Sequence, residues 1–330
     1  MLNDIPDNSL SGDWKSLFYT IQHDLAQSPA QTIADLNKVR KYLLNTSQAR
    51  VFLIGSSATE ERLTQSLTKL FSNFDHTPAA IQTYTNTKLI NQRVMSRMNT
   101  TESPVFAGLI NPDSHTGVFI NSAPLTSYRD TDRVSLLKFL AASLYGGGGK
   151  QSVYTKTTGA GLSYSTGVGA SPSTGRFSYY AERTPELPQT LRFVIDEIKR
   201  SPVDTSMTDY VVSLAVGAFR SADDYEVRGE AMANDLADGR MPAIIKQFRL
   251  AILKLRKEPG LINKIYDYKD QVYETILPGY GKPTRDVAGG NYLVIGPEKQ
   301  MQAYEAYLKS VDGANTVLYR LYPRDFWIGE

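Results

Sequence analysis

Residues 145–164 read YGGGGKQSVYTKTTGAGLSY and join a predicted helix to a predicted β-hairpin. Four consecutive glycines followed by Lys150 suggest a phosphate-binding loop. That motif requires a glycine, four further residues and then Gly-Lys-Ser/Thr, and it follows a strand. Here Leu144 and Gln151 occupy the positions that need a glycine and a hydroxyl, and the run follows a helix. We therefore expect the glycines to end a helix and to allow a sharp turn.

The residues on the N-terminal side of this stretch predict two helices, a strand and a third helix. Residues 13–44 carry apolar side chains at helical spacing on both sides of Ser28-Pro29, which predicts a hairpin of two helices. The run RVFLIG, residues 50–55, is short, apolar and ended by glycine, as in a buried strand. Ser57 and Glu60 have the spacing of a capping box at the start of the helix that follows, over residues 59–71.

The remaining sequence mixes strands and helices. The polar segment 78–100 predicts a loop, and residues 200–280 predict mainly helices. Thr131-Asp132 is placed to cap an apolar helix that the glycines end. This order predicts a layered architecture of strands and helices. The expected strands are 105–110, 117–121, 162–169, 175–182 and 291–296; the expected helices are 131–145, 186–199 and a last one that contains Met301, Tyr304, Tyr307 and Leu308.

Composition excludes several classes of function. The 36 basic and 34 acidic residues give a net charge of +2, too small a field to predict binding to nucleic acid. Cysteine is absent, so disulfides and thiolate-bound metals are excluded. We expect no membrane span, since no run approaches the ~18 apolar residues required. The first residues lack the pattern of a signal peptide, and the compartment stays open between cytoplasm, periplasm and organelle.

Histidine is too scarce to predict a catalytic centre. The three histidines, His23, His76 and His115, stand alone, and neither H-x-x-E-H nor H-E-x-x-H occurs. No G-x-S-x-G elbow is present, and the paired carboxylates lie in polar or helical contexts. From the residues alone, therefore, we predict no catalytic residues and no metal site. What remains is a glycine-rich turn that opens onto a β-hairpin.

The order of elements resembles the pitrilysin/insulinase metallopeptidases, the inverzincins, and among them the presequence-protease type. The resemblance rests on the strand 51–54 with its helix, the long crossover, the helix 131–145, the Gly-Gly turn and the motif Gly161-Leu-Ser-Tyr164-Ser165. The closing NYLVIGPEKQMQAYEAYLKSV, residues 291–311, fits the end of that family. The resemblance implies an α+β, pitrilysin/LuxS-like domain whose mixed, largely antiparallel sheet has helices on one side and a helical hairpin before it.

The resemblance also implies a division of labour between two halves. One half carries H-x-x-E-H and zinc, whereas the other lacks the metal and helps to enclose unfolded peptide substrates. This chain resembles the C-terminal, zinc-lacking half. Residues 1–45 would be the tail of a preceding domain or a linker, and residues 46–330 the non-catalytic domain. The chain alone is then expected to be inactive, with a zinc-bearing half or partner subunit supplying the metal.

The resemblance makes four residues candidates for holding substrate: Tyr164, Lys156, Gly147 and Gly148. Tyr164 matches a family tyrosine, but the arginine expected six or seven residues earlier is replaced by threonine at 157 and 158. The nearest cation is Lys156, a point charge without the planar fork of arginine. Gly147 and Gly148 would keep side chains out of the path of a bound peptide, which could pair with a sheet edge near Tyr164.

Two alternatives stay open. One is a non-enzymatic structural or binding subunit with the same fold, as in core subunits of respiratory complexes. The other is an unrelated α+β enzyme whose site combines Arg183, Asp130 and tyrosines.

Overall fold

The computed structural model of the chain describes residues 10–47, 49, 51–80, 88–101, 103–217 and 225–326. Two compact units are formed by these residues. The larger unit contains the described residues within 1–13, 89–220 and 244–328, and the smaller unit those within 14–88 and 221–243. The expected boundary between residues 45 and 46 stays a prediction.

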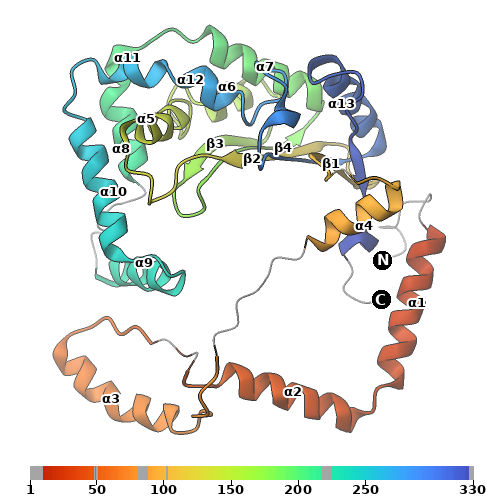
Figure 1. Cartoon of the computed structure of the whole chain (residues 1–330), viewed down its shortest axis with the longest axis vertical. Helices are drawn as coiled ribbons and strands as arrows, with labels where there is room; N and C mark the ends of the chain where they lie inside the picture. Colours follow the sequence, from red (N-terminus) through yellow and green to blue (C-terminus); the bar gives the residue numbers. More distant parts are fainter. Residues whose placement is uncertain are drawn as a thin grey trace. The chain divides into compact units, whose positions relative to one another are not determined.

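The larger unit is built on one six-stranded sheet (Figure 1). Its strand order is β3-β4-β2-β5-β1-β6. The pairs β3–β4, β4–β2 and β2–β5 are antiparallel, whereas β5–β1 and β1–β6 are parallel. The strands are β1 (Phe106–Ile110), β2 (Gly117–Pro124), β3 (Ser165–Ser171), β4 (Arg176–Thr184), β5 (Asn291–Gly296) and β6 (Tyr319–Leu321).

Helices cover one side of this sheet (Figure 1). Those in contact with strands include α5, α6, α7 and α13, and α8, α11 and α12 pack on α5. The mixed, largely antiparallel sheet with helices on one side is therefore confirmed. The helices of this unit are α4 (Leu89–Met98), α5 (Arg133–Ala142), α6 (Val153–Gly159), α7 (Leu187–Arg200), α8 (Thr208–Gly217), α10 (Pro242–Leu255) from residue 244 onward, α11 (Leu261–Tyr266), α12 (Lys269–Tyr273) and α13 (Glu298–Val311).

Strand alternation explains which side the helices cover. Successive side chains of a strand point to opposite faces of the sheet. In β2, Phe119 and Asn121 are buried under the helices, while Ile120 between them is 46% exposed. In β4, Tyr179 is buried and its neighbour Tyr180 is exposed. The core thus lies between the sheet and the helices, with the other face of the sheet less covered.

The smaller unit contains α1 (Leu10–Ala26) from residue 14 onward, α2 (Pro29–Leu43), α3 (Ser57–Phe71) and α9 (Tyr225–Ala237). The break between α1 and α2 falls at the expected Ser28, which caps α2 by accepting a hydrogen bond from the Gln31 backbone. Ser57 was the expected N-cap of α3, but the N-cap is Ser56, whose hydroxyl accepts a hydrogen bond from the backbone N–H of Thr59. The helix therefore begins one residue earlier than a cap at Ser57 would predict. Neither α2 nor α3 has a buried residue.

Two expectations about the chain before β1 are wrong. Residues 51–54 are neither a strand nor buried, and their side chains are between 41% and 51% exposed. The reason is that an apolar run becomes a strand only where neighbouring strands satisfy its backbone, and the described sheet excludes these residues. The segment 78–100, expected as a loop, contains α4. That helix buries Val94 and forms an ion pair between Arg97 and Asp325 near the C-terminus.

Candidate functional site

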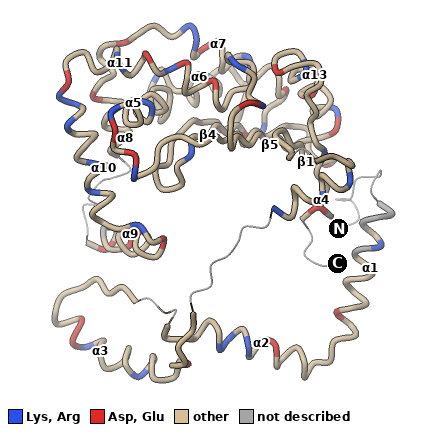
Figure 2. Tube along the Cα trace, viewed as in Figure 1, with Lys and Arg blue, Asp and Glu red and all other residues tan. Residues whose placement is uncertain are grey.

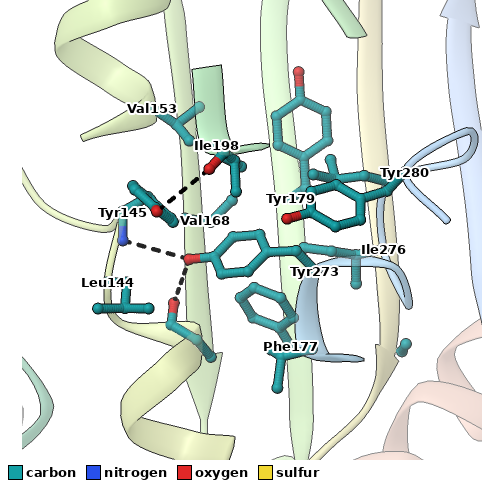
Figure 3. Packing of buried hydrophobic residues seen from close by; sticks show 14 of the residues in the cluster. Leu144, Tyr145, Val153, Val168, Phe177, Tyr179, Ile198, Tyr273, Ile276 and Tyr280 are labelled. Atoms are coloured by element: carbon teal, nitrogen blue, oxygen red, sulfur yellow. Dashed lines mark hydrogen bonds between the residues drawn. The ribbon is translucent and has the colours of Figure 1, made fainter. Parts of the chain in front are cut away.

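The glycine-rich turn begins on a buried anchor, Tyr145, which follows α5 (Figure 3). Its backbone N–H donates to the hydroxyl of Tyr273 at 3.4 Å, and that hydroxyl donates to the carbonyl of Ala142 at 3.2 Å. The hydroxyl of Tyr145 itself donates to the carbonyl of Ile198 in α7 at 3.4 Å. Burial raises the pKa of both phenols, so they remain neutral donors. The end of α5 is therefore fixed to the core before the glycines begin.

Gly147 and Gly148 lie in different surroundings. Gly147 has a φ of +71°, a backbone conformation that suits glycine. A Cβ on Gly147 would lie 2.7 Å from the hydroxyl of Tyr210, which donates to the carbonyl of Gly146. A Cβ on Gly148 would meet no atom within 4 Å. Gly147 is thus required by the turn, and Gly148 borders open space.

A short helix, α6, separates the glycines from the hairpin, where the residues alone predicted a turn that leads straight into it. Ser152 is its N-cap and accepts from the backbone N–H of Thr155 at 3.1 Å. The hydroxyl of Thr155 donates to the carbonyl of Gly148 at 3.3 Å, so the helix also fixes the glycine turn. The sequence contains the signal for this helix, since Ser152 and Thr155 have N-cap spacing just after Gly149-Lys150-Gln151.

Lys156 on α6 is already paired. Its ammonium lies 2.8 Å from the carboxylate of Glu197 on α7, and both side chains are about 30% exposed. The two threonines at the position of the expected arginine are buried or half-buried. Thr158 donates to the carbonyl of Tyr154 at 2.7 Å within the helix, and Thr157 is buried. The structure thus ties Lys156 to α7.

Tyr164 lies directly before β3, at the edge of the sheet, and its side chain is 69% exposed. Its backbone N–H donates to the carbonyl of Glu182 at 3.0 Å, which fixes it beside the end of β4. The guanidinium of Arg183 lies over the Tyr164 ring, 4.8 Å from the ring centre. The structure therefore brings together an exposed phenol and a guanidinium, from two strands of one hairpin.

Arg183 has an uncommon backbone for a residue with a side chain, with a φ of +51°. Its neighbours explain why this conformation persists. The carbonyl of Glu182 accepts from Tyr164 and from the hydroxyl of Ser163, and the hydroxyl of Thr184 donates to the carbonyl of Gly117. Strain of this kind costs about 1–3 kcal/mol and is concentrated at functional sites. Across the described ranges, no carboxylate forms an ion pair with Arg183.

Sequence reasoning did not pair Arg183 with Tyr164, although the hairpin register contains the signal. Ser165 pairs with Glu182 and Ser171 with Arg176. Counting back from the turn at 172–175 therefore brings residue 183 opposite residue 164. The alternative enzyme site combined Arg183 with Asp130 and with tyrosines that it did not specify. The carboxylate of Asp130 instead accepts from the backbone and hydroxyl of Ser127, both at 2.7 Å.

No metal cluster is found in the described part of the chain: no three His, Asp or Glu side chains lie close enough to hold an ion. Basic and acidic residues are interspersed along the helices of the larger unit (Figure 2). Among the helices that the structure describes, none has both the length and the hydrophobicity that crossing a bilayer requires.

The chain is similar to several solved structures. They include the inactive domain of a peptidase M16 from Pseudomonas fluorescens, with 14% identity, 74% of this chain and 51% of that chain covered, and a TM-score of 0.42. A predicted insulinase family protease from Yersinia pestis has 10% identity over 77% of this chain and 54% of its own, with a TM-score of 0.44. The first half of the periplasmic protease PqqL from Escherichia coli has 10% identity, coverage of 80% and 56%, and a TM-score of 0.44.

This chain spans about half the length of each of these structures. No family model matches the sequence, and no curated protein matches it. The descriptions of the structures from Pseudomonas fluorescens and Yersinia pestis name the M16 and insulinase families, respectively.

Proposed function

We propose that this chain is a zinc-lacking half of an insulinase-type peptidase, which holds unfolded peptides while a zinc-bearing half cuts them. The observation that carries the proposal is the pair Tyr164–Arg183 at a sheet edge, an exposed phenol under a guanidinium with which no carboxylate of the described residues forms an ion pair. The absence of H-x-x-E-H from the sequence supports the same division of labour. Under this proposal, cleavage requires the zinc of the other half.

The geometry of the pair suits an oxygen of a peptide. The ring of Tyr164 holds the guanidinium by a cation–π contact, which leaves the N–H edge of the fork open. A carboxylate or backbone carbonyl in the plane of the fork would accept from Arg183, and the hydroxyl of Tyr164 would supply a further donor. A hydrogen bond to a charged group contributes about 1.5–3 kcal/mol.

Within this proposal Arg183 takes the role for which the sequence offered Lys156. An arginine fork binds planar oxygens in two-point fashion, which a lysine does not. Lys156 is moreover neutralised by Glu197 at 2.8 Å, so binding a substrate oxygen would require breaking that pair. We call the pair Tyr164–Arg183 the clamp. Within the proposal, Gly148, which borders open space, and Gly147 would keep side chains out of the path of a peptide that approaches the clamp.

The test is peptide turnover in the assembled enzyme. A zinc-bearing half from the same source is assayed alone, with this chain, and with the Tyr164→Phe or Arg183→Gln chain. We expect turnover only with the chain, and kcat/KM lowered about tenfold or more by either substitution, because each removes a donor to the substrate. Tyr154→Phe, an exposed tyrosine on α6, is the matched control.

Two outcomes would contradict the proposal. Unchanged kcat/KM with both variants would remove the clamp. If the chain stabilises the other half but adds nothing to peptide turnover, the chain is a structural subunit with this fold instead.

A further inference from the structure

A cavity of about 480 Å³ opens at the end of the sheet where β1, β4 and β5 finish. Its lining comes from three separate segments: the loop after β1, the junction of β4 with α7, and the first turns of α13. None of these residues was singled out as a site by the sequence. The volume is large enough for a bulky side chain and lies in the lower half of the range of typical ligand pockets, about 300–1,000 Å³.

The buried amide of Gln300 makes this cavity a preformed one. Its Nε2 donates to the carbonyl of Pro185 at 2.9 Å, and its Oε1 accepts from the backbone N–H of Leu187 at 3.2 Å. Further contacts at 3.4 and 3.5 Å reach the carbonyls of Thr184 and His115. One side chain of α13 thus joins all three segments. A site whose walls are already fixed loses little entropy when it is filled.

The walls favour an uncharged, flat group. Four of the lining residues are proline, namely Pro112, Pro185, Pro188 and Pro297, and each has a fixed backbone angle and no N–H to satisfy. Lys299 and Glu186 bring one charge of each sign to the lining, so no net charge selects an ion. The negative face of an aromatic ring packs well against the C–H groups of proline rings.

The cavity begins two residues from the clamp. Arg183 and Pro185 are joined by Thr184, and two residues span at most about 7 Å. In an extended peptide, the side chains of residues i and i+2 point the same way, and these residues are also about 7 Å apart. An extended peptide that runs from Arg183 toward Pro185 would bring the side chain two residues away within reach of the cavity.

We propose that this proline-lined cavity is a specificity pocket for an aromatic side chain, two residues from the peptide group that Tyr164 and Arg183 hold. The inference rests on the proposed function and names the substrate class: unfolded peptides with an aromatic residue at that spacing.

Binding of labelled peptides to the whole chain, measured by fluorescence anisotropy, tests this. The peptides are Gly/Ser-rich and contain one glutamate, which binds the clamp. Each also contains one phenylalanine, placed one, two or three residues before or after that glutamate. We expect a phenylalanine two residues from the glutamate, in one of the two directions along the peptide, to give binding about tenfold or more tighter than alanine at the same position. The advantage should vanish in Ala303→Trp, which fills the cavity, and persist in Ala306→Trp, an exposed position of the same helix outside the lining.

The results separate this inference from the proposed function. If binding depends on Arg183 and Tyr164 but not on phenylalanine spacing or on Ala303→Trp, the pocket is overturned and the clamp stands. If Arg183→Gln and Tyr164→Phe leave all peptides bound equally well, the clamp and the pocket built on it both fail.

Discussion

Adjacent residues of the glycine run differ in what a side chain would meet, and this difference is measurable. Gly147 has a left-handed backbone and faces the Tyr210 hydroxyl, whereas Gly148 faces open space. We expect Gly147→Ala to lower the free energy of unfolding by about 1–2 kcal/mol, the cost of a left-handed residue with a Cβ. Gly148→Ala is the matched control and should change it little. Equal urea midpoints for the two variants would contradict this account of the turn.

Arg183 gives a second prediction for a single residue. Because its φ is +51°, Arg183→Gly should be more stable than Arg183→Ala by about 1 kcal/mol, since only glycine adopts that backbone without strain. Both variants remove the guanidinium and should lose peptide binding alike. Thermal unfolding of the two proteins measures the difference. An alanine variant as stable as the glycine variant would mean that the strain is absent.

At the residue scale, the sequence predicted Tyr164 but not its partner. Tyr164 was found by a motif local in sequence. Arg183 is 19 positions away, and only the register of the hairpin places it opposite. Lys156 was favoured because it is close in sequence to the position of the missing arginine. In the structure it forms an ion pair with Glu197 on α7, the helix that follows the β3–β4 hairpin. Proximity in sequence does not reveal which opposite charge the fold supplies.

At the scale of elements, the end of α5 depends on the hydroxyl of Tyr273. It accepts from the N–H of Tyr145 and donates to the carbonyl of Ala142. We expect Tyr273→Phe to cost about 1–3 kcal/mol, because it leaves a buried N–H and a buried carbonyl without a partner. Urea unfolding measures it, with Tyr154→Phe as the exposed control. A cost equal to that of the control would show that these bonds do not hold the turn.

Glu258 links α5 to the segment after α10, and its contribution should depend on pH. Hydrogen bonds from Arg133 and then Lys264 lower the pKa of this carboxyl from 4.5 to about 2. A carboxyl whose pKa is lowered by folding stabilises the fold at any pH above its pKa in the unfolded chain. This contribution is lost as the pH falls from about 4.5 to about 2. The urea midpoint of Glu258→Gln should therefore lie below that of the wild type at pH 7 and approach it near pH 2. Glu61→Gln, a control without an ion pair among the described residues, should show no such convergence. A constant difference would refute the linkage.

Two apolar runs show how far pattern predicts an element. VFLIG at 51–55 and YLVIG at 292–296 each precede a helix. The second run is β5, between β2 and β1, whereas the first lies outside the described sheet and is exposed. Pattern predicted most of the helices and the five long strands, because each was locally consistent, but it missed α4, α6 and the short strand β6. It failed at 51–54 because a strand also requires partners, which local sequence does not specify.

Hydrogen exchange distinguishes these two runs. We expect the amides of residues 292–295 to be strongly protected by strand pairing and those of 51–54 to exchange rapidly. Comparable protection of both runs in the isolated chain would mean that residues 51–54 have found strand partners.

At the scale of the whole molecule, the role that we propose is to hold peptides without cutting them. The sequence contains three separate histidines and no cysteine, so it offers few ligands for a hydrolytic metal. Burial explains why the tyrosines of the core are not candidates for acid–base chemistry. Their pKa is raised above the usual value, as for Tyr307, where it reaches about 12. Tyr164 differs from them because it is exposed and its ring contacts the guanidinium of Arg183.

The affinity of the purified chain for an unfolded, labelled peptide is the most direct measure of this role, compared between the wild type and Arg183→Gln. We predict that the wild type binds the peptide without cleaving it, and that the substitution raises Kd about tenfold or more. The same Kd for both proteins would contradict the account, as would cleavage of the peptide by the chain alone.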